Sequence, residues 1–153
     1  MLLTQQRQTE GQLEPKQVNK RFMAKVMIVD DDVELLEELN VILSFNNYEV
    51  EVISDSLLAF EKACELKPDV VILDLKMKIK DGFQLADELQ HSFETKSIPL
   101  IAITGFFTQR EHMLTMKMHG IKSMLFKPID PRTLLLKIAS VLEGAKNKGD
   151  QAL

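Results

Sequence analysis

Short apolar runs alternate with amphipathic stretches along most of the chain. Runs such as Val70-Val71-Ile72-Leu73 are apolar at every position, which is typical of parallel strands buried on both faces. Between the runs, apolar residues recur at helical spacing. The pattern predicts five strands, over residues 25–30, 48–53, 69–75, 98–104 and 121–127. It predicts a helix after each strand, over residues 33–46, 55–67, 81–93 and 108–119 and from residue 130 onward.

Capping residues indicate where two of these helices begin. Asp31 and Glu34 have the spacing of a capping box, and so do Asp81 and Gln84. In such a box the first side chain bonds a backbone amide of the first turn, and the second reaches back to the cap. We therefore expect the first and third helices to begin at these pairs.

The order of the elements predicts the fold class. Five consecutive strand–helix units, with strands apolar on both faces, indicate a parallel sheet covered by helices on both sides. Right-handed crossovers between parallel strands leave few possible topologies. The expected fold is α/β, a doubly wound sandwich of three layers.

The length and composition fit one domain with short extensions. The chain has 153 residues, of which 45% are hydrophobic, enough to fill a single core. Residues 1–24 contain five glutamines and no sustained apolar period, so we expect a flexible N-terminal arm. The predicted domain covers residues 25–145, and residues 146–153 are expected to form a C-terminal tail.

The distribution of charge narrows the classes of function. Residues 26–145 carry 12 basic and 20 acidic side chains, a net charge of −8. Such a body is poorly suited to neutralising phosphates, so direct binding to nucleic acid is not expected. It is well suited to attracting a divalent cation.

Two further features bear on location. The longest apolar runs have four residues, too few for a membrane span, and the first residues lack the pattern of a signal peptide. Cys64 is the single cysteine and cannot form an internal disulfide. We expect a cytoplasmic protein with no membrane association.

Polar residues capable of chemistry lie at the ends of the apolar strands. In chain order they are Asp30, Asp31, Asp32, Asp74, Thr104 and Lys127. Because ligands bind outside the carboxyl ends of the strands in open parallel sheets, we expect these side chains to gather at one rim. Clustered carboxylates repel one another, and Mg²⁺ is the simplest cation that compensates them.

Asp74 is the best candidate for a nucleophile because it alone interrupts an apolar strand end. A carboxylate beside Mg²⁺, a lysine and a hydroxyl can attack a phosphoryl group and form an aspartyl phosphate. Each residue also has a plain structural interpretation, since acids cap helices and Thr-Gly or Lys-Pro pairs are common in turns. Their shared position at strand ends favours a functional site.

Four motifs in this order resemble the receiver domain of two-component response regulators. They are Val26-Met27-Ile28-Val29-Asp30-Asp31-Asp32, Val71-Ile72-Leu73-Asp74 with Asp81-Gly82 seven residues on, Ile103-Thr104-Gly105, and Phe126-Lys127-Pro128. The resemblance covers residues 25–145. It implies a flavodoxin-like sheet with strand order 2-1-3-4-5, the order the chemotaxis receiver has.

The resemblance also implies a role for each matching residue. Asp74 would accept a phosphoryl group from a sensor histidine kinase or a phosphotransfer protein and contribute to the metal site. Mg²⁺ would be bound by Asp31, positioned by Asp30, and bound by the backbone carbonyl of Lys76. The phosphoryl oxygens would be held by Thr104 and Lys127. Asp32 is expected to cap the helix that follows.

The chain departs from the family pattern at two places. Met124 occupies the position of the usual switch aromatic, which follows Thr104 inward after phosphorylation. A thioether can fill the same gap but offers no hydroxyl. The loop after Asp74 reads Lys76-Met77-Lys78-Ile79-Lys80, with Lys78 where the family often has proline. These lysines are either a solvated face or a feature that changes the potential at the acidic pocket.

The function that this resemblance implies is a single-domain response regulator, which is a signalling protein and not an enzyme. It would act on a downstream protein by contact or by phosphorelay, as a monomer or weak homodimer. One alternative is a pseudo-receiver that binds partners without phosphorylation. Another is a phosphatase of the haloacid dehalogenase type, since Asp30-x-Asp32 matches its nucleophile motif, although Glu34 does not fit.

Overall fold

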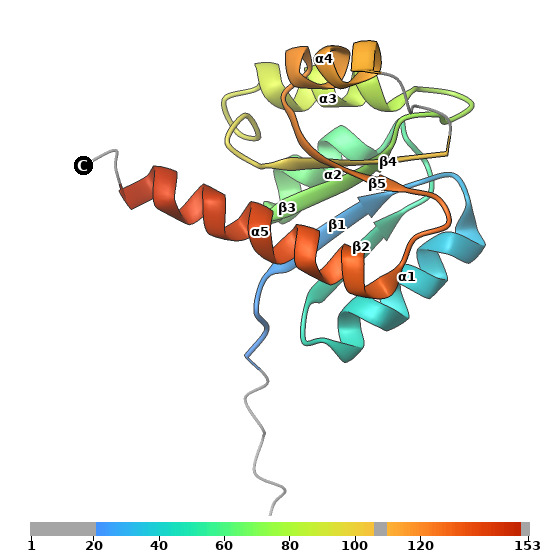
Figure 1. Ribbon diagram of the computed structural model, residues 1–153. Coiled ribbons are helices and arrows are strands. Elements are labelled where there is room, and N and C mark those ends of the chain that lie inside the picture. Colours follow the sequence, from blue (N-terminus) through green and yellow to red (C-terminus); the bar gives the residue numbers. More distant parts are fainter. Residues whose placement is uncertain (1–20, 106–109, 151–153) are drawn as a thin grey trace, which may run out of the picture.

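The fold is built on one five-stranded parallel sheet. The computed structural model describes residues 21–105 and 110–150 (Figure 1). The strands are β1 (Lys25–Val29), β2 (Glu49–Ile53), β3 (Val70–Asp74), β4 (Leu100–Thr104) and β5 (Ile121–Phe126). Their order is β2-β1-β3-β4-β5, and every pair is parallel. The predicted fold class and strand order are confirmed.

Helices cover both faces of the sheet. They are α1 (Val33–Phe45), α2 (Ala59–Leu66), α3 (Gly82–His91), α4 (Arg110–Met118) and α5 (Pro131–Asp150). Figure 1 shows α1 and α5 on one face, with α2, α3 and α4 on the other. No helix in the described ranges is long and apolar enough to cross a membrane.

Alternating strand residues divide the hydrophobic core into two layers. In β1, Val26 and Ile28 face the layer under α1 and α5, where Leu39 and Ile138 are fully buried. The intervening Met27 faces the layer formed with α2, α3 and α4. Because successive side chains of a strand point to opposite faces, a continuous apolar run fills both layers at once.

Several element boundaries differ from those expected. Asp32, not Asp31, is the N-cap of α1, and its side chain accepts a hydrogen bond from Leu35 N at 3.2 Å. The capping box predicted for Asp31 and Glu34 is therefore wrong, while the capping role expected of Asp32 is confirmed. The Asp31 carboxylate is engaged elsewhere, by the amide of Lys78 at 3.1 Å.

The second helix also begins later than expected, and the fifth helix runs past the expected end of the domain. α2 begins only at Ala59, because Asp55 accepts a bond from Leu57 N and directs residues 56–58 into a turn. α5 continues to Asp150, beyond the expected domain end at residue 145. The predicted start of the fourth helix at Thr108 lies outside the described residues.

Gly82 allows α3 to approach the end of β3. The predicted capping box is present here, since Asp81 accepts a bond from Gln84 N and Gln84 accepts one from Asp81 N. A Cβ atom at Gly82 would collide with the carbonyl oxygen of Asp74 and lie 2.7 Å from Leu75 Cα. Only a residue without a side chain therefore lets the helix begin directly beneath the Asp74 backbone.

We predict that Gly82→Ala destabilises the protein by about 2 kcal/mol, because backbone atoms must move to admit the methyl group. Gly144→Ala in α5 is the matched control, since a Cβ atom there meets nothing within 4 Å. That control should stabilise the fold by up to about 1 kcal/mol, the difference in helix propensity between glycine and alanine. Urea unfolding measures both changes. Equal stabilities for the two variants would contradict the close approach.

Candidate functional site

The register of the sheet brings polar residues from three strands to one rim. Val29 pairs with Leu73, so the residues that follow them, Asp30 directly after β1 and Asp74 at the end of β3, lie side by side. Asp74 itself pairs with Ile103, which places Thr104 next in line at the end of β4. Thr104 pairs in turn with Phe126 of β5. The rim is therefore set by parallel pairing alone.

Three carboxylates converge at this rim. Asp30, Asp31 and Asp74 each contribute an oxygen, and these oxygens lie within 4.8 Å of one another. Asp30 has no exposed surface and Asp74 is 4% exposed, whereas Asp31 is exposed. Charges of like sign at this separation repel one another, and burial strengthens the repulsion because water screens it less.

Lys127 supplies the positive charge that faces this cluster. Its Nζ atom lies 3.0 Å from Asp30 Oδ2 and 3.2 Å from Asp74 Oδ2. The position is set by the sheet, since the Lys127 amide donates to the Thr104 carbonyl at 2.9 Å. Desolvation alone would lower the pKa of the ammonium group, but the hydrogen bonds and charges of Asp30 and Asp74 outweigh it and raise that pKa.

Burial makes the ionised form of the Asp30 carboxyl group less stable. The pKa of its carboxyl group is raised from 3.8 to about 6, chiefly by burial and further by the charge of Asp74. The Asp32 amide, which donates to Asp30 Oδ1 at 2.9 Å, and the Lys127 ammonium group act in the opposite direction. Their combined effect does not offset the loss of water, so the ionised form of Asp30 is disfavoured.

Asp74 is held from two sides. Its Oδ1 atom accepts a hydrogen bond from the Lys76 amide at 3.1 Å, and its Oδ2 atom accepts one from Lys127 at 3.2 Å. Thr104 is 1% exposed and lies on the adjacent strand. The carboxylate thus lies between a fixed amide and a fixed cation, with a hydroxyl-bearing side chain on the neighbouring strand end.

The residues present fit a divalent cation. Three carboxylates face one ammonium group, which leaves a negative excess at the rim. The buried Asp30 Oδ2 atom is in contact with the Lys127 ammonium group at 3.0 Å, and its remaining coordination sites face the acidic cluster. Oxygen ligands of this kind suit Mg²⁺, which binds one or two carboxylates together with water and phosphate oxygens.

Comparison with known proteins assigns the family. A family model described as the response regulator receiver domain matches residues 26–139. The chain belongs to this family. Protein PilH of Pseudomonas aeruginosa is 34% identical over 122 residues, which cover 80% of this chain and 100% of PilH.

Two further relatives differ in how much of them the chain covers. Response regulator MprA of Mycobacterium ulcerans is 29% identical over 128 residues, which cover 84% of this chain but 54% of MprA. The chain thus spans about half of that relative. The solved structure of chemotaxis protein CheY4 of Vibrio cholerae has a TM-score of 0.73 and 31% identity, and the match covers 78% of this chain and 98% of CheY4.

Membership in the receiver family confirms the resemblance seen in the sequence. Receiver domains are signalling modules whose general properties include phosphorylation and Mg²⁺ binding at an acidic pocket. The rim at Asp30, Asp31 and Asp74 is the acidic cluster of this chain. The individual role of each residue remains a prediction.

The predicted switch residue, Met124, lies in β5 two residues before the end of the strand at the rim. Met124 pairs with Ala102, two positions before the Thr104–Phe126 pair. It is partly buried and packs against the core layer of α2, α3 and α4. Its neighbour on the same side of β5, Phe126, is 48% exposed.

Two contacts of the loop after β3 were not predicted from the sequence. The Lys78 amide donates to Asp31 Oδ2 at 3.1 Å, and the Lys80 amide donates to Ser56 Oγ at 3.3 Å. Backbone donors carry no signal in the sequence, because every residue except proline has one. The loop therefore participates in the site through its main chain.

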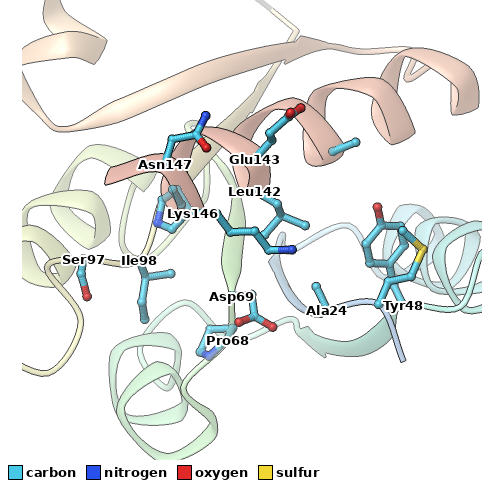
Figure 2. A pocket seen from close by; sticks show the side chains of 14 residues that line it. Ala24, Tyr48, Pro68, Asp69, Ser97, Ile98, Leu142, Glu143, Lys146 and Asn147 are labelled. Atoms are coloured by element: carbon cyan, nitrogen blue, oxygen red, sulfur yellow. The ribbon is translucent and has the colours of Figure 1, made fainter. Parts of the chain in front are cut away.

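A cavity of about 820 Å³ lies away from this rim (Figure 2). Its lining includes Ala24, Tyr48, Asp69 and Pro99, which come just before four of the strands, and Lys146 of α5. Figure 2 shows the Lys146 side chain directed toward the sheet edge. None of the predicted site residues lines this cavity. The cavity lies where the strands begin, and the site lies at their carboxyl ends.

From the raised pKa of Asp30 we predict how the stability of the fold changes with pH. The folded state favours the protonated form of Asp30, and this preference contributes to the free energy of unfolding. The contribution is complete below pH 3.8 and is lost as the pH rises through about 6. Asp30→Asn removes the titration. Between pH 4 and pH 7 without Mg²⁺, the stability of this variant relative to the parent should rise by up to about 3 kcal/mol.

Urea unfolding at a series of pH values measures this difference. If the difference in free energy of unfolding between Asp30→Asn and the parent stays constant over the whole range, or falls as the pH rises, then burial does not destabilise the ionised form of Asp30.

Proposed function

We propose that the chain accepts a phosphoryl group on Asp74 from a phosphohistidine of a sensor histidine kinase or a phosphotransfer protein. The reaction depends on Mg²⁺. The observation that carries the proposal is the contact of Asp74 with Lys127 at 3.2 Å within a cluster of three carboxylates. A buried acid that keeps a cation beside it is suited to receive an anionic group.

The bond changes are those of a phosphoryl transfer. An oxygen of Asp74 forms a bond to phosphorus, and the bond between phosphorus and the donor's histidine nitrogen breaks. The nitrogen keeps the electron pair of that bond. Asp30, Asp31, Asp74 and the Lys76 carbonyl are proposed to hold Mg²⁺, which when bound neutralises charge on the transferring oxygens. Lys127 and the Thr104 hydroxyl bind the phosphoryl oxygens once they are on Asp74.

The surroundings favour Asp74 over Asp30 and Asp31 as the phosphoryl acceptor. Asp30 is closed off from solvent, and its raised pKa reduces its ionised fraction. Asp31 is exposed, and within the described residues no ion pair joins it to Lys127. Asp74 combines an edge of exposed surface with direct contact to the cation.

The output is proposed to pass through protein contact or phosphorelay. New phosphoryl contacts would draw Thr104 inward, and Met124 would repack in the space beside it, since a thioether adapts to irregular gaps. The net charge of −8 over residues 26–145 argues against direct binding to nucleic acid. We propose a cytoplasmic signalling protein without enzymatic turnover, monomeric or weakly dimeric.

Incubation with acetyl phosphate, followed by intact-mass measurement, tests the acceptor. The parent with Mg²⁺ should gain one phosphoryl group, and chelation of Mg²⁺ should remove most of the gain. Asp74→Asn should lower the labelled fraction at least about tenfold, since loss of the nucleophile removes the covalent route. Asp55→Asn is the matched control, because Asp55 is an exposed acid at the end of β2 and should label like the parent.

The same experiment separates the alternatives. A parent that takes up no label from acetyl phosphate with Mg²⁺ would favour a pseudo-receiver that binds partners without phosphorylation. Label that survives Asp74→Asn but is lost in Asp30→Asn would point to the phosphatase-like use of Asp30. Either outcome would overturn the proposal.

A further inference from the structure

Asp31 is the least constrained acid of the cluster. It follows the end of β1 in an exposed position, and no ion pair among the described residues joins it to Lys127. Its charged neighbours Asp30 and Asp74 lie within 4.8 Å and repel it. An exposed aspartate under this repulsion favours rotamers that carry the carboxylate away from the site.

One backbone group opposes that tendency. The amide of Lys78, in the loop after β3, donates a hydrogen bond to Asp31 Oδ2 at 3.1 Å. In the described part of the chain, this is the hydrogen bond that the Asp31 side chain accepts. A hydrogen bond to an ionised acceptor is stronger than one between neutral groups.

The loop is built to hold this amide in place. Met77, directly before Lys78, is 7% exposed and belongs to the core layer of α2, α3 and α4. Two residues after Lys78, the amide of Lys80 donates to the hydroxyl of the buried Ser56 at 3.3 Å. The Lys78 amide therefore lies between one apolar anchor and one polar anchor, each on a well-packed part of the fold.

We propose that the Lys78 backbone amide is a positioning group that keeps the Asp31 carboxylate directed into the acidic pocket and so raises the affinity for Mg²⁺. This inference rests on the Mg²⁺ site of the proposed function. The Lys78 side chain has no part in it. The amide acts through Asp31 by fixing the orientation of a ligand before the ion arrives, which lowers the entropy lost on binding.

Lys78→Pro tests the role of the amide because proline has no N–H group. The comparison is with Lys78→Ala, which removes the same side-chain charge but keeps the amide. Titration of each variant with Mg²⁺ by calorimetry should give a dissociation constant about five- to tenfold higher for Lys78→Pro than for Lys78→Ala, the effect of losing one charge-assisted hydrogen bond at an exposed site. Equal constants for two folded variants would overturn the proposal.

A second pair of measurements does not require proline in the loop. Ser56→Ala removes the acceptor for the Lys80 amide and should raise the Mg²⁺ dissociation constant about two- to threefold by loosening the loop. In the absence of Mg²⁺, Asp31→Ala should speed hydrogen exchange of the Lys78 amide at least about fivefold, since its acceptor is gone. Unchanged exchange in Asp31→Ala would overturn the proposal even if Lys78→Pro does not fold.

The outcomes distinguish a failure of this inference from a failure of the proposed function on which it rests. A parent that binds no Mg²⁺ contradicts the metal site of the proposed function. A parent that binds Mg²⁺, with Lys78→Pro and Ser56→Ala binding it as tightly, leaves that function intact and contradicts only the role of the Lys78 amide.

Discussion

Repulsion among three carboxylates at the ends of β1 and β3 is the interaction on which the site depends. Asp30, Asp31 and Asp74 lie within 4.8 Å of one another, and two of them are buried. Among the residues that the structure describes, the ammonium group of Lys127 faces them. The folded chain therefore carries an excess of negative charge at this rim, which a divalent cation would offset.

The rest of the molecule maintains this unfavourable arrangement. Two apolar layers, one under α1 and α5 and one under α2, α3 and α4, fix the register of the strands. Gly82 lets α3 start against the Asp74 carbonyl, and the loop between them carries the amides that hold Asp74 and Asp31. The free energy gained in the core offsets the cost of gathering like charges, which is how functional sites in general keep strained groups in place.

Much of this organisation could be predicted from the sequence. Continuous apolar runs identified the buried strands, and residues at the strand ends identified the rim, because parallel pairing leaves little freedom in where those ends meet. The capping-box spacing at Asp31 and Glu34 is misleading, and Asp32 is the cap of α1, since adjacent acids look equivalent until the loop at Lys78 engages one of them. The amide contacts of that loop could not be predicted, because they depend on main-chain geometry and not on residue type.

The central claim is that, of the three clustered acids, Asp74 carries the phosphoryl group while Asp30 and Asp31 serve the cation. Its most direct test is to phosphorylate the parent chain with Mg²⁺, reduce the acyl phosphate with borohydride and map the peptides by mass spectrometry. Reduction converts the modified aspartate to homoserine. We expect homoserine at position 74 alone. Homoserine at position 30 or 31 would contradict it.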